Sequence, residues 1–200
     1  MAVRTVRTSP AKVGDWVAVI GGGPVGQLVL QVLRRAGMGQ VAMVEPSTFR
    51  RQTATRLGAD QALAPDEARK ALAGGELAPL DHVFECSGYL PRSSWASTCW
   101  PPAAASAWSG CPPAPSRSTR SPPSPRRRAS SPASSTWQRS SPRVLLLASG
   151  AVDVDTLTTA VVPIEWFADA FAALRQPEST MKVLIDPKQS PAGSEPTTTV

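Results

Sequence analysis

Six residues near the start of the chain, Gly21 to Gly26, read GGGPVG and form a glycine-rich turn between two strongly patterned segments. The five residues before the turn, Trp16–Ile20, are continuously apolar and rich in β-branched side chains, which is typical of a strand buried on both faces. Residues 25–35, which follow, carry apolar side chains at helical spacing. A GxGxxG turn between a strand and a helix predicts the first unit of a dinucleotide-binding fold.

The glycines of this turn have distinct expected roles. Gly21 permits the tight turn out of the strand, Gly23 lets backbone N–H groups approach a pyrophosphate, and Gly26 lets the helix pack against its strand. The N-terminus of the helix then faces the phosphates with its partial positive charge. We therefore predict that the whole turn binds the cofactor: Gly21, Gly22, Gly23, Pro24, Val25 and Gly26.

An acidic residue follows the glycines at the distance that this fold requires. A second apolar strand is predicted over residues 40–44, and Glu45 comes directly after it, 19 residues beyond Gly26. An acid about 20 residues past the glycines accepts hydrogen bonds from the adenosine ribose in such folds. Because Glu45 would also repel a 2′-phosphate, we predict NAD as the cofactor and regard NADP as the weaker candidate. Arg50 and Arg51 soften this preference, since either side chain could receive a phosphate.

The chain beyond Glu45 continues to alternate between helix and strand. Helices are predicted over residues 51–57 and 65–72, and strands over residues 59–62 and 81–86. This alternation is typical of an α/β fold with a Rossmann-type, doubly wound parallel sheet.

Loops at the carboxyl ends of the strands line the cofactor crevice in such sheets. Cys86 and Ser87, which end the strand over residues 81–86, are therefore predicted as further cofactor contacts. We interpret the single histidine, His82, as structural, and we assign the Cys86 thiol no catalytic role, because neither residue has an identifiable catalytic partner.

Residues 91–143 differ sharply from the rest of the chain in composition. They hold 11 of the 21 prolines, 15 serines and 8 arginines, and they contain no Val, Ile, Leu, Met, Phe, Tyr, Asp, Glu or Lys. Such a segment cannot bury enough apolar area to offset the entropy of ordering, so we predict a disordered linker. The remaining residues carry 13 Lys and Arg against 15 Asp and Glu, a net charge of −2 rather than +6, so the basic charge belongs to this segment alone. We expect no nucleic-acid partner, because the tryptophans of the segment have no charged groove or scaffold around them. The predicted organisation is a first part of the dinucleotide-binding domain over 1–90, the linker over 91–143, a last part of that domain over 144–187 and a disordered tail over 188–200.

Two origins of the segment 91–143 remain open. It is either a genuine Ser/Pro/Arg-rich insertion or a stretch translated in the wrong reading frame. Tryptophan has the single codon TGG, and reading the codons around Trp108 with a shift of one base gives a strand that ends like Val-Gly-Val-Pro over residues 108–112. We favour a frameshift near Leu90 with a compensating one near Arg143.

Cysteine usage and hydropathy restrict the setting. The three cysteines, Cys86, Cys99 and Cys111, form no CxxC pair and, with one histidine, predict neither a disulfide framework nor a zinc site. The longest apolar stretch, 16–33, is interrupted by glycines, a proline and glutamines, and no signal peptide is predicted. These features predict a cytoplasmic protein with no membrane partner and no metal of its own.

Four groups of residues resemble the cofactor-binding (C-terminal) domain of the zinc-dependent medium-chain alcohol and polyol dehydrogenases: from Val13 to Gly26, Glu45 with Arg50, the turn from Leu57 to Asp60, and from Phe84 to Gly88. Sorbitol, threonine and butanediol dehydrogenases belong to this group. The resemblance implies that Glu45 and Arg50 contact the adenosine ribose and that Lys182 approaches the pyrophosphate. It extends to four later stretches, which resemble the family's closing elements: 146–152, 161–164, 166–174 and 182–185.

The resemblance also implies parts that this sequence lacks. The family's catalytic half, with zinc ligands of Cys, His and acidic type, precedes the cofactor domain, and Met1 begins where that half should be ending. We therefore expect an NAD-binding fragment without catalytic residues, whose intact parent transfers hydride between a small alcohol or polyol and nicotinamide. The homo-oligomer contact of the family maps to 91–143 and is expected to be lost. The alternative is a non-enzymatic dinucleotide-binding module with a regulatory Ser/Pro/Arg-rich arm.

Overall fold

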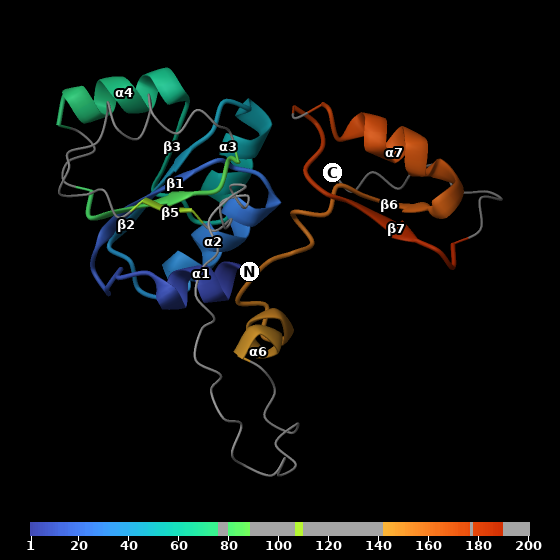
Figure 1. Ribbon diagram of the computed structural model, residues 1–200, viewed down its shortest axis with the longest axis horizontal. Coiled ribbons are helices and arrows are strands. Elements are labelled where there is room, and N and C mark those ends of the chain that lie inside the picture. Colours follow the sequence, from blue (N-terminus) through green and yellow to red (C-terminus); the bar gives the residue numbers. More distant parts are fainter. Residues whose placement is uncertain (76–79, 89–106, 110–141, 177, 190–200) are drawn as a thin grey trace, which may run out of the picture.

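The computed structural model describes residues 1–75, 80–88, 107–109, 142–176 and 178–189. Its main feature is a five-stranded sheet in which every neighbouring pair is parallel, in the order β3-β2-β1-β4-β5 (Figure 1). The Rossmann-type fold class predicted from the sequence is confirmed. The strands of this sheet are β1 (Trp16–Ile20), β2 (Gln40–Val44), β3 (Gln61–Leu63), β4 (His82–Glu85) and β5 (Ala107–Ser109).

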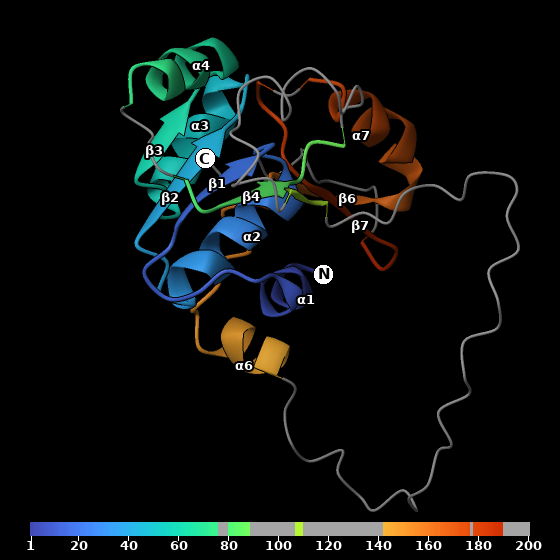
Figure 2. The same ribbon diagram turned by 60° about the vertical axis from the view of Figure 1, so that its left-hand side comes forward.

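Helices cover both faces of the sheet, as the two-residue period of its strands requires. Val17 and Val19 of β1 point into one apolar cluster and Ala18 into the other. The first cluster is closed by α2 (Pro24–Arg35) and α3 (Thr48–Arg56), with α1 (Ala2–Thr8) packed on α2. The second is closed by α4 (Pro65–Ala73). Figure 2 shows α4 on the opposite side of the sheet from α1 and α2.

Two boundaries near the predicted site differ from the sequence-based expectation. Helix α3 begins at Thr48 rather than at residue 51, because the Ser47 hydroxyl accepts a hydrogen bond from the Arg50 N–H and caps the helix three residues earlier. Strand β3 covers Gln61–Leu63 rather than 59–62. The reason is the turn before it: Gly58 has a φ of 100°, and the Asp60 carboxylate accepts a hydrogen bond from the N–H of Val41 in β2.

The closing part of the chain forms a second, two-stranded parallel sheet of β6 (Ala160–Pro163) and β7 (Val183–Asp186). Between these strands lie the short 3-10 helix η2 (Ile164–Trp166) and α7 (Phe167–Ala173). These elements agree with the predicted 161–164, 166–174 and 182–185, although their strands pair with each other and not with the main sheet. Helix α6 (Pro142–Ala148) overlaps only the first three residues of the predicted stretch 146–152, because Gly150 takes a φ of 66° and terminates the helix.

Strand β5 lies inside the range 91–143, for which the sequence predicts a disordered linker, and it pairs with β4 in the main sheet. The start of α6 also falls in this range. Residues 91–106 and 110–141, like most of the predicted tail over 188–200, lie outside the described residues, and the frameshift hypothesis remains a prediction. No helix within the described ranges is both long and apolar enough to cross a membrane.

Candidate functional site

The glycine turn has the shape that its sequence predicts. Gly21 has a φ of 96°, and a Cβ atom on it would lie 2.6 Å from the backbone of Ser87 at the end of β4. A Cβ atom on Gly26 would lie 1.8 Å from the carbonyl oxygen of Gly21. No side chain fits at either position, so the predicted roles of Gly21 in the turn and of Gly26 in close packing are confirmed.

Gly23 differs from these two glycines because its surroundings are open. It caps the N-terminus of α2 in an extended conformation, with no side chain capping the helix, and nothing lies within 4 Å of the position its Cβ would take. Pro24 begins the helix, where its missing N–H costs no hydrogen bond. The first turn of α2 therefore presents its N–H groups and its partial positive charge to open space.

Glu45 is held in place by two backbone N–H groups. Its side chain is 5% exposed; Oε2 accepts a hydrogen bond of 2.6 Å from the N–H of Gly22, and Oε1 accepts one of 3.0 Å from the N–H of Ser47. The methylene groups of Glu45 also lie over Gly22, where an added Cβ would be 2.9 Å from Cγ of Glu45. A glycine at position 22 and an acid at position 45 are thus coupled by contact and by hydrogen bonding.

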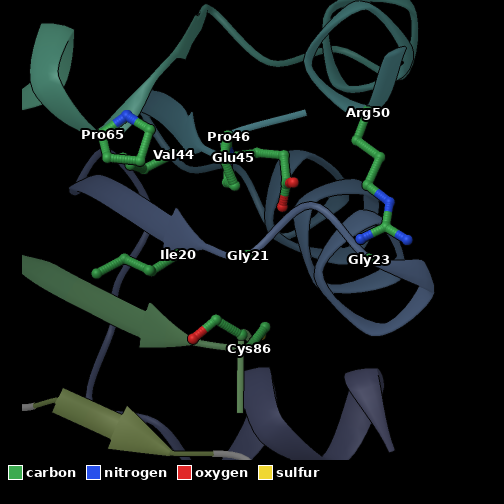
Figure 3. Close-up of a pocket in the computed structure, with 10 residues that line it drawn as sticks. Ile20, Gly21, Gly23, Val44, Glu45, Pro46, Arg50, Pro65 and Cys86 are labelled. Carbon is green, nitrogen blue, oxygen red and sulfur yellow. The ribbon is translucent and has the colours of Figure 1, made fainter. Parts of the chain in front are cut away.

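Arg50 extends from α3 toward the glycine turn, on the same side of the cavity as Glu45 (Figure 3). One guanidinium nitrogen, Nη2, donates to the carbonyl of Thr180 at 3.4 Å. Its Nε is buried and has no hydrogen-bond partner among the described residues. The site thus holds a fixed carboxylate and a cation with an unused donor.

A cavity of about 460 Å³ opens at the carboxyl ends of β1, β2 and β4. This volume lies in the range of small-molecule and cofactor sites, and parallel sheets of this type bind ligands at this edge. The residues that line it come from the strand ends and from the turns after them: Ile20, Gly21, Gly23, Val44, Glu45, Pro46, Arg50, Pro65, Cys86 and Ser87.

Cys86 contributes to the cavity wall as a neutral thiol. Burial, with a smaller contribution from the charge of Glu85, raises the pKa of Cys86 to about 12. A thiol that stays protonated at neutral pH is a poor nucleophile, which agrees with the prediction that Cys86 has no catalytic role. Ser87 lies beside it at the cavity, and its N–H donates to the Glu85 carboxylate at 2.6 Å.

The predicted site residues fall into three groups. Gly21, Gly23, Glu45, Arg50, Cys86 and Ser87 line the cavity together. Gly22, Pro24, Val25 and Gly26 do not line it, although they build the turn and the helix start beneath it. Lys182 does not line it either; its side chain is exposed, and its carbonyl accepts a hydrogen bond from the N–H of Thr159.

Several contributors were not predicted. Ile20, Val44, Pro46 and Pro65 also line the cavity. Gln27 is completely buried beneath it and bonds to the backbone of both Gly22 and Arg50. The sequence offered one signal for Gln27, since a polar side chain interrupts the apolar face of the predicted helix there.

A metal does not fit the described part of the site. Within the described ranges, no three His, Cys, Asp or Glu side chains come close enough together to hold a metal ion. His82 lies at the opposite end of β4 from Cys86 and pairs with Asp15 at 3.2 Å. The polar groups at this cavity are the fixed Glu45 carboxylate, the Arg50 side chain and the N-terminus of α2, which has no side-chain cap.

Comparison with known proteins agrees with this geometry. Residues 24–120 match the family model described as "Zinc-binding dehydrogenase". D-guloside 3-dehydrogenase of Escherichia coli K12 is 39% identical over 93 residues, which are 44% of this chain and 26% of that protein. The chain is therefore similar to the zinc-binding dehydrogenase family over residues 24–120, just under half of its length. It spans about a quarter of the length of this curated relative.

Solved structures of dehydrogenases share the fold. The structure of 2R,3R-butanediol dehydrogenase from Bacillus subtilis is 26% identical, with a TM-score of 0.64, and the match covers 94% of this chain and 55% of that one. A structure described as a short chain alcohol dehydrogenase from E. coli CFT073, complexed with NADH, shares the fold with a TM-score of 0.66 at 18% identity, over 92% of this chain and 56% of that one. The resemblance to medium-chain zinc alcohol and polyol dehydrogenases seen in the sequence is therefore confirmed.

Proposed function

We propose that this chain binds NAD, with the adenosine end in the cavity at the carboxyl ends of β1, β2 and β4. One observation carries the proposal: a buried carboxylate, Glu45, is fixed beside an uncapped helix N-terminus across an open glycine. An acid for ribose hydroxyls and a helix start for a pyrophosphate are the two contacts that this cofactor class needs.

Each polar group of the site has a task in this proposal. The N–H groups at the start of α2 donate to the pyrophosphate, which approaches over Gly23. The Glu45 carboxylate uses one lone pair of each oxygen for backbone N–H groups and keeps the others for the ribose hydroxyls. Arg50 supplies its positive charge next to the same ligand. The apolar wall, including Pro46 and Pro65, suits the flat adenine ring.

The position of Glu45 favours NAD over NADP. A 2′-phosphate would place two negative charges against a carboxylate that is already fixed and desolvated. Arg50 lies at the same cavity and could offset part of this repulsion. We therefore expect a preference for NAD rather than complete exclusion of NADP.

We further propose that the whole protein of which these residues form the cofactor part transfers hydride between the carbon of a small alcohol or polyol and the nicotinamide. The bound cofactor supplies the hydride acceptor. The described residues supply binding and orientation of the dinucleotide but no metal site, so we propose that they do not oxidise an alcohol unaided.

Calorimetric titration of the chain with NADH, NADPH and ADP-ribose tests this proposal. We expect NADH and ADP-ribose to bind and NADPH to bind more weakly. In Glu45→Ala, the affinity for NADH should fall by roughly 10- to 100-fold, because hydrogen bonds to a charged group are lost, while the preference over NADPH disappears. A thermal melt of each protein controls for folding. An unchanged NADH affinity in a folded Glu45→Ala variant would remove Glu45 from the site, and no binding of any of the three ligands would refute the proposal.

A further inference from the structure

One buried amide beneath the glycine turn is not explained by packing alone. The side chain of Gln27, in the first turns of α2, has no exposed surface. Its Nε2 donates to the carbonyl oxygen of Gly22 at 3.1 Å and to the carbonyl oxygen of Arg50 at 2.9 Å. Each of these bonds reaches a different segment of the cofactor site: the glycine turn and helix α3.

The two acceptors fix which way the amide points. Only the nitrogen of Gln27 can donate to two carbonyl groups, so its oxygen, Oε1, faces the other way. Oε1 is buried and has no hydrogen-bond partner among the described residues. An unpaired buried oxygen is unfavourable, and an apolar side chain of the same length would avoid it. What the amide adds is the connection between two backbone segments.

These two bonds close a ring of hydrogen bonds around the base of the site. The N–H of Gly22 donates to one oxygen of Glu45, and the N–H of Ser47 donates to the other. The N–H of Arg50 donates to the Ser47 hydroxyl at 3.3 Å. Gln27 joins the carbonyl of Arg50 back to the carbonyl of Gly22 and completes the circuit. Apart from Arg50, the members of the ring are buried.

We propose that Gln27 is a positioning residue for the dinucleotide. By joining the glycine turn to the start of α3, it sets the distance from the N-terminus of α2, where the pyrophosphate binds, to Glu45 and Arg50. This inference rests on the proposed function, since it assumes the dinucleotide in this cavity. Gln27 does not line the cavity, and so acts through the groups that do.

Helix α2 offers a matched control one turn further on. Gln31 is also buried, at 5% exposed, and also forms two hydrogen bonds to backbone, both with Asp153. Its bonds tie α2 to the segment after α6 and touch neither the glycine turn nor α3. Removal of the Gln31 amide should therefore cost stability without changing the cofactor site.

The test compares Gln27→Met and Gln31→Met in the full chain, since methionine keeps the length of the side chain and removes its hydrogen bonds. NADH affinity should fall by roughly 5- to 30-fold in Gln27→Met, the effect of losing one or two neutral hydrogen bonds, and change less than twofold in Gln31→Met. Hydrogen exchange in the absence of ligand should become faster at the amides of Gly22 and Ser47 in Gln27→Met only.

The two readouts separate the two proposals. If the wild-type chain binds no NADH, the proposed function fails, while amide exchange still reports whether the ring exists. If the wild type binds NADH and folded Gln27→Met binds it equally well, the positioning role is wrong, whatever the exchange shows. Should Gln27→Met fail to fold, the side-chain NH₂ of Gln27 in the wild type decides: fast, solvent-like exchange of these protons would refute the ring.

Discussion

Replacement of Gly23 by alanine separates binding from folding more cleanly than any other change in the glycine turn. Gly23 has a φ of −68° and a ψ of 179°, which alanine adopts without strain, and its added methyl group meets no protein atom within 4 Å. Alanine is a poorer helix cap than glycine by several tenths of a kcal/mol, but it also restricts the unfolded chain by about 0.4–1 kcal/mol. The two effects offset, so we expect the free energy of unfolding to change by less than about 0.5 kcal/mol.

The effect on binding follows from where the methyl group points. The space over Gly23 is part of the cavity, and a phosphate must enter it to reach the N–H groups at the start of α2. Losing one hydrogen bond to a charged group costs about 1.5–3 kcal/mol, so the Kd for NADH should rise roughly 10- to 150-fold.

Thermal melts and calorimetric titration with NADH measure the two quantities separately. The neighbouring Gly22→Ala serves as the contrast, because its methyl group would lie 2.9 Å from Cγ of Glu45 and should weaken both folding and binding. A folded Gly23→Ala variant with wild-type NADH affinity would show that the pyrophosphate does not lie over Gly23. A large loss of stability in Gly23→Ala would refute the conclusion that this position is open.

Three further predictions concern the frame around the site. Gly26→Ala should prevent stable folding, because its methyl group would lie 1.8 Å from the carbonyl oxygen of Gly21; a melting temperature within a few degrees of wild type would contradict this. Cys86 should resist iodoacetamide at pH 8 and react faster as the pH rises toward its pKa of about 12, which site-resolved mass spectrometry measures; rapid labelling of the folded chain at pH 8 would refute the burial argument. Because folding raises this pKa from 9.0, the free energy of unfolding should decline between pH 9 and 12, which urea unfolding measures. Asp60→Ala should destabilise the chain by about 1–2 kcal/mol, since the carboxylate bonds a backbone N–H of β2 as well as a half-exposed arginine, whereas Asp66→Ala should cost about 0.5 kcal/mol or less; equal urea midpoints for the two variants would count against this reasoning.

The parts of the site that could be predicted are those encoded over a short stretch of chain. The turn Gly21 to Gly26 and the acid Glu45 are predictable because the turn geometry and the spacing of one βαβ unit fix them. Ser47 and Gln27 were missed because their roles depend on partners brought together by folding: Gln27 bonds to Arg50, 23 residues away. The contact between Lys182 and a pyrophosphate is implied only by resemblance and stays a prediction. In the structure the Lys182 side chain is exposed and does not line the cavity.

Strand β5 shows where a compositional argument reaches its limit. Residues 91–143 contain no branched aliphatic side chain, and this absence is a sound reason to predict that they form no apolar core. The ladder between Ala107–Ser109 and β4, however, is built from backbone N–H and C=O groups, which every residue except proline provides. Three consecutive residues free of proline are enough to pair with the edge of β4, whose neighbour on the other side, β1, is already in place. Composition thus predicts which segments can supply an apolar core. Which backbone segment pairs with an existing sheet edge depends instead on the fold around that edge and not on the composition of the segment.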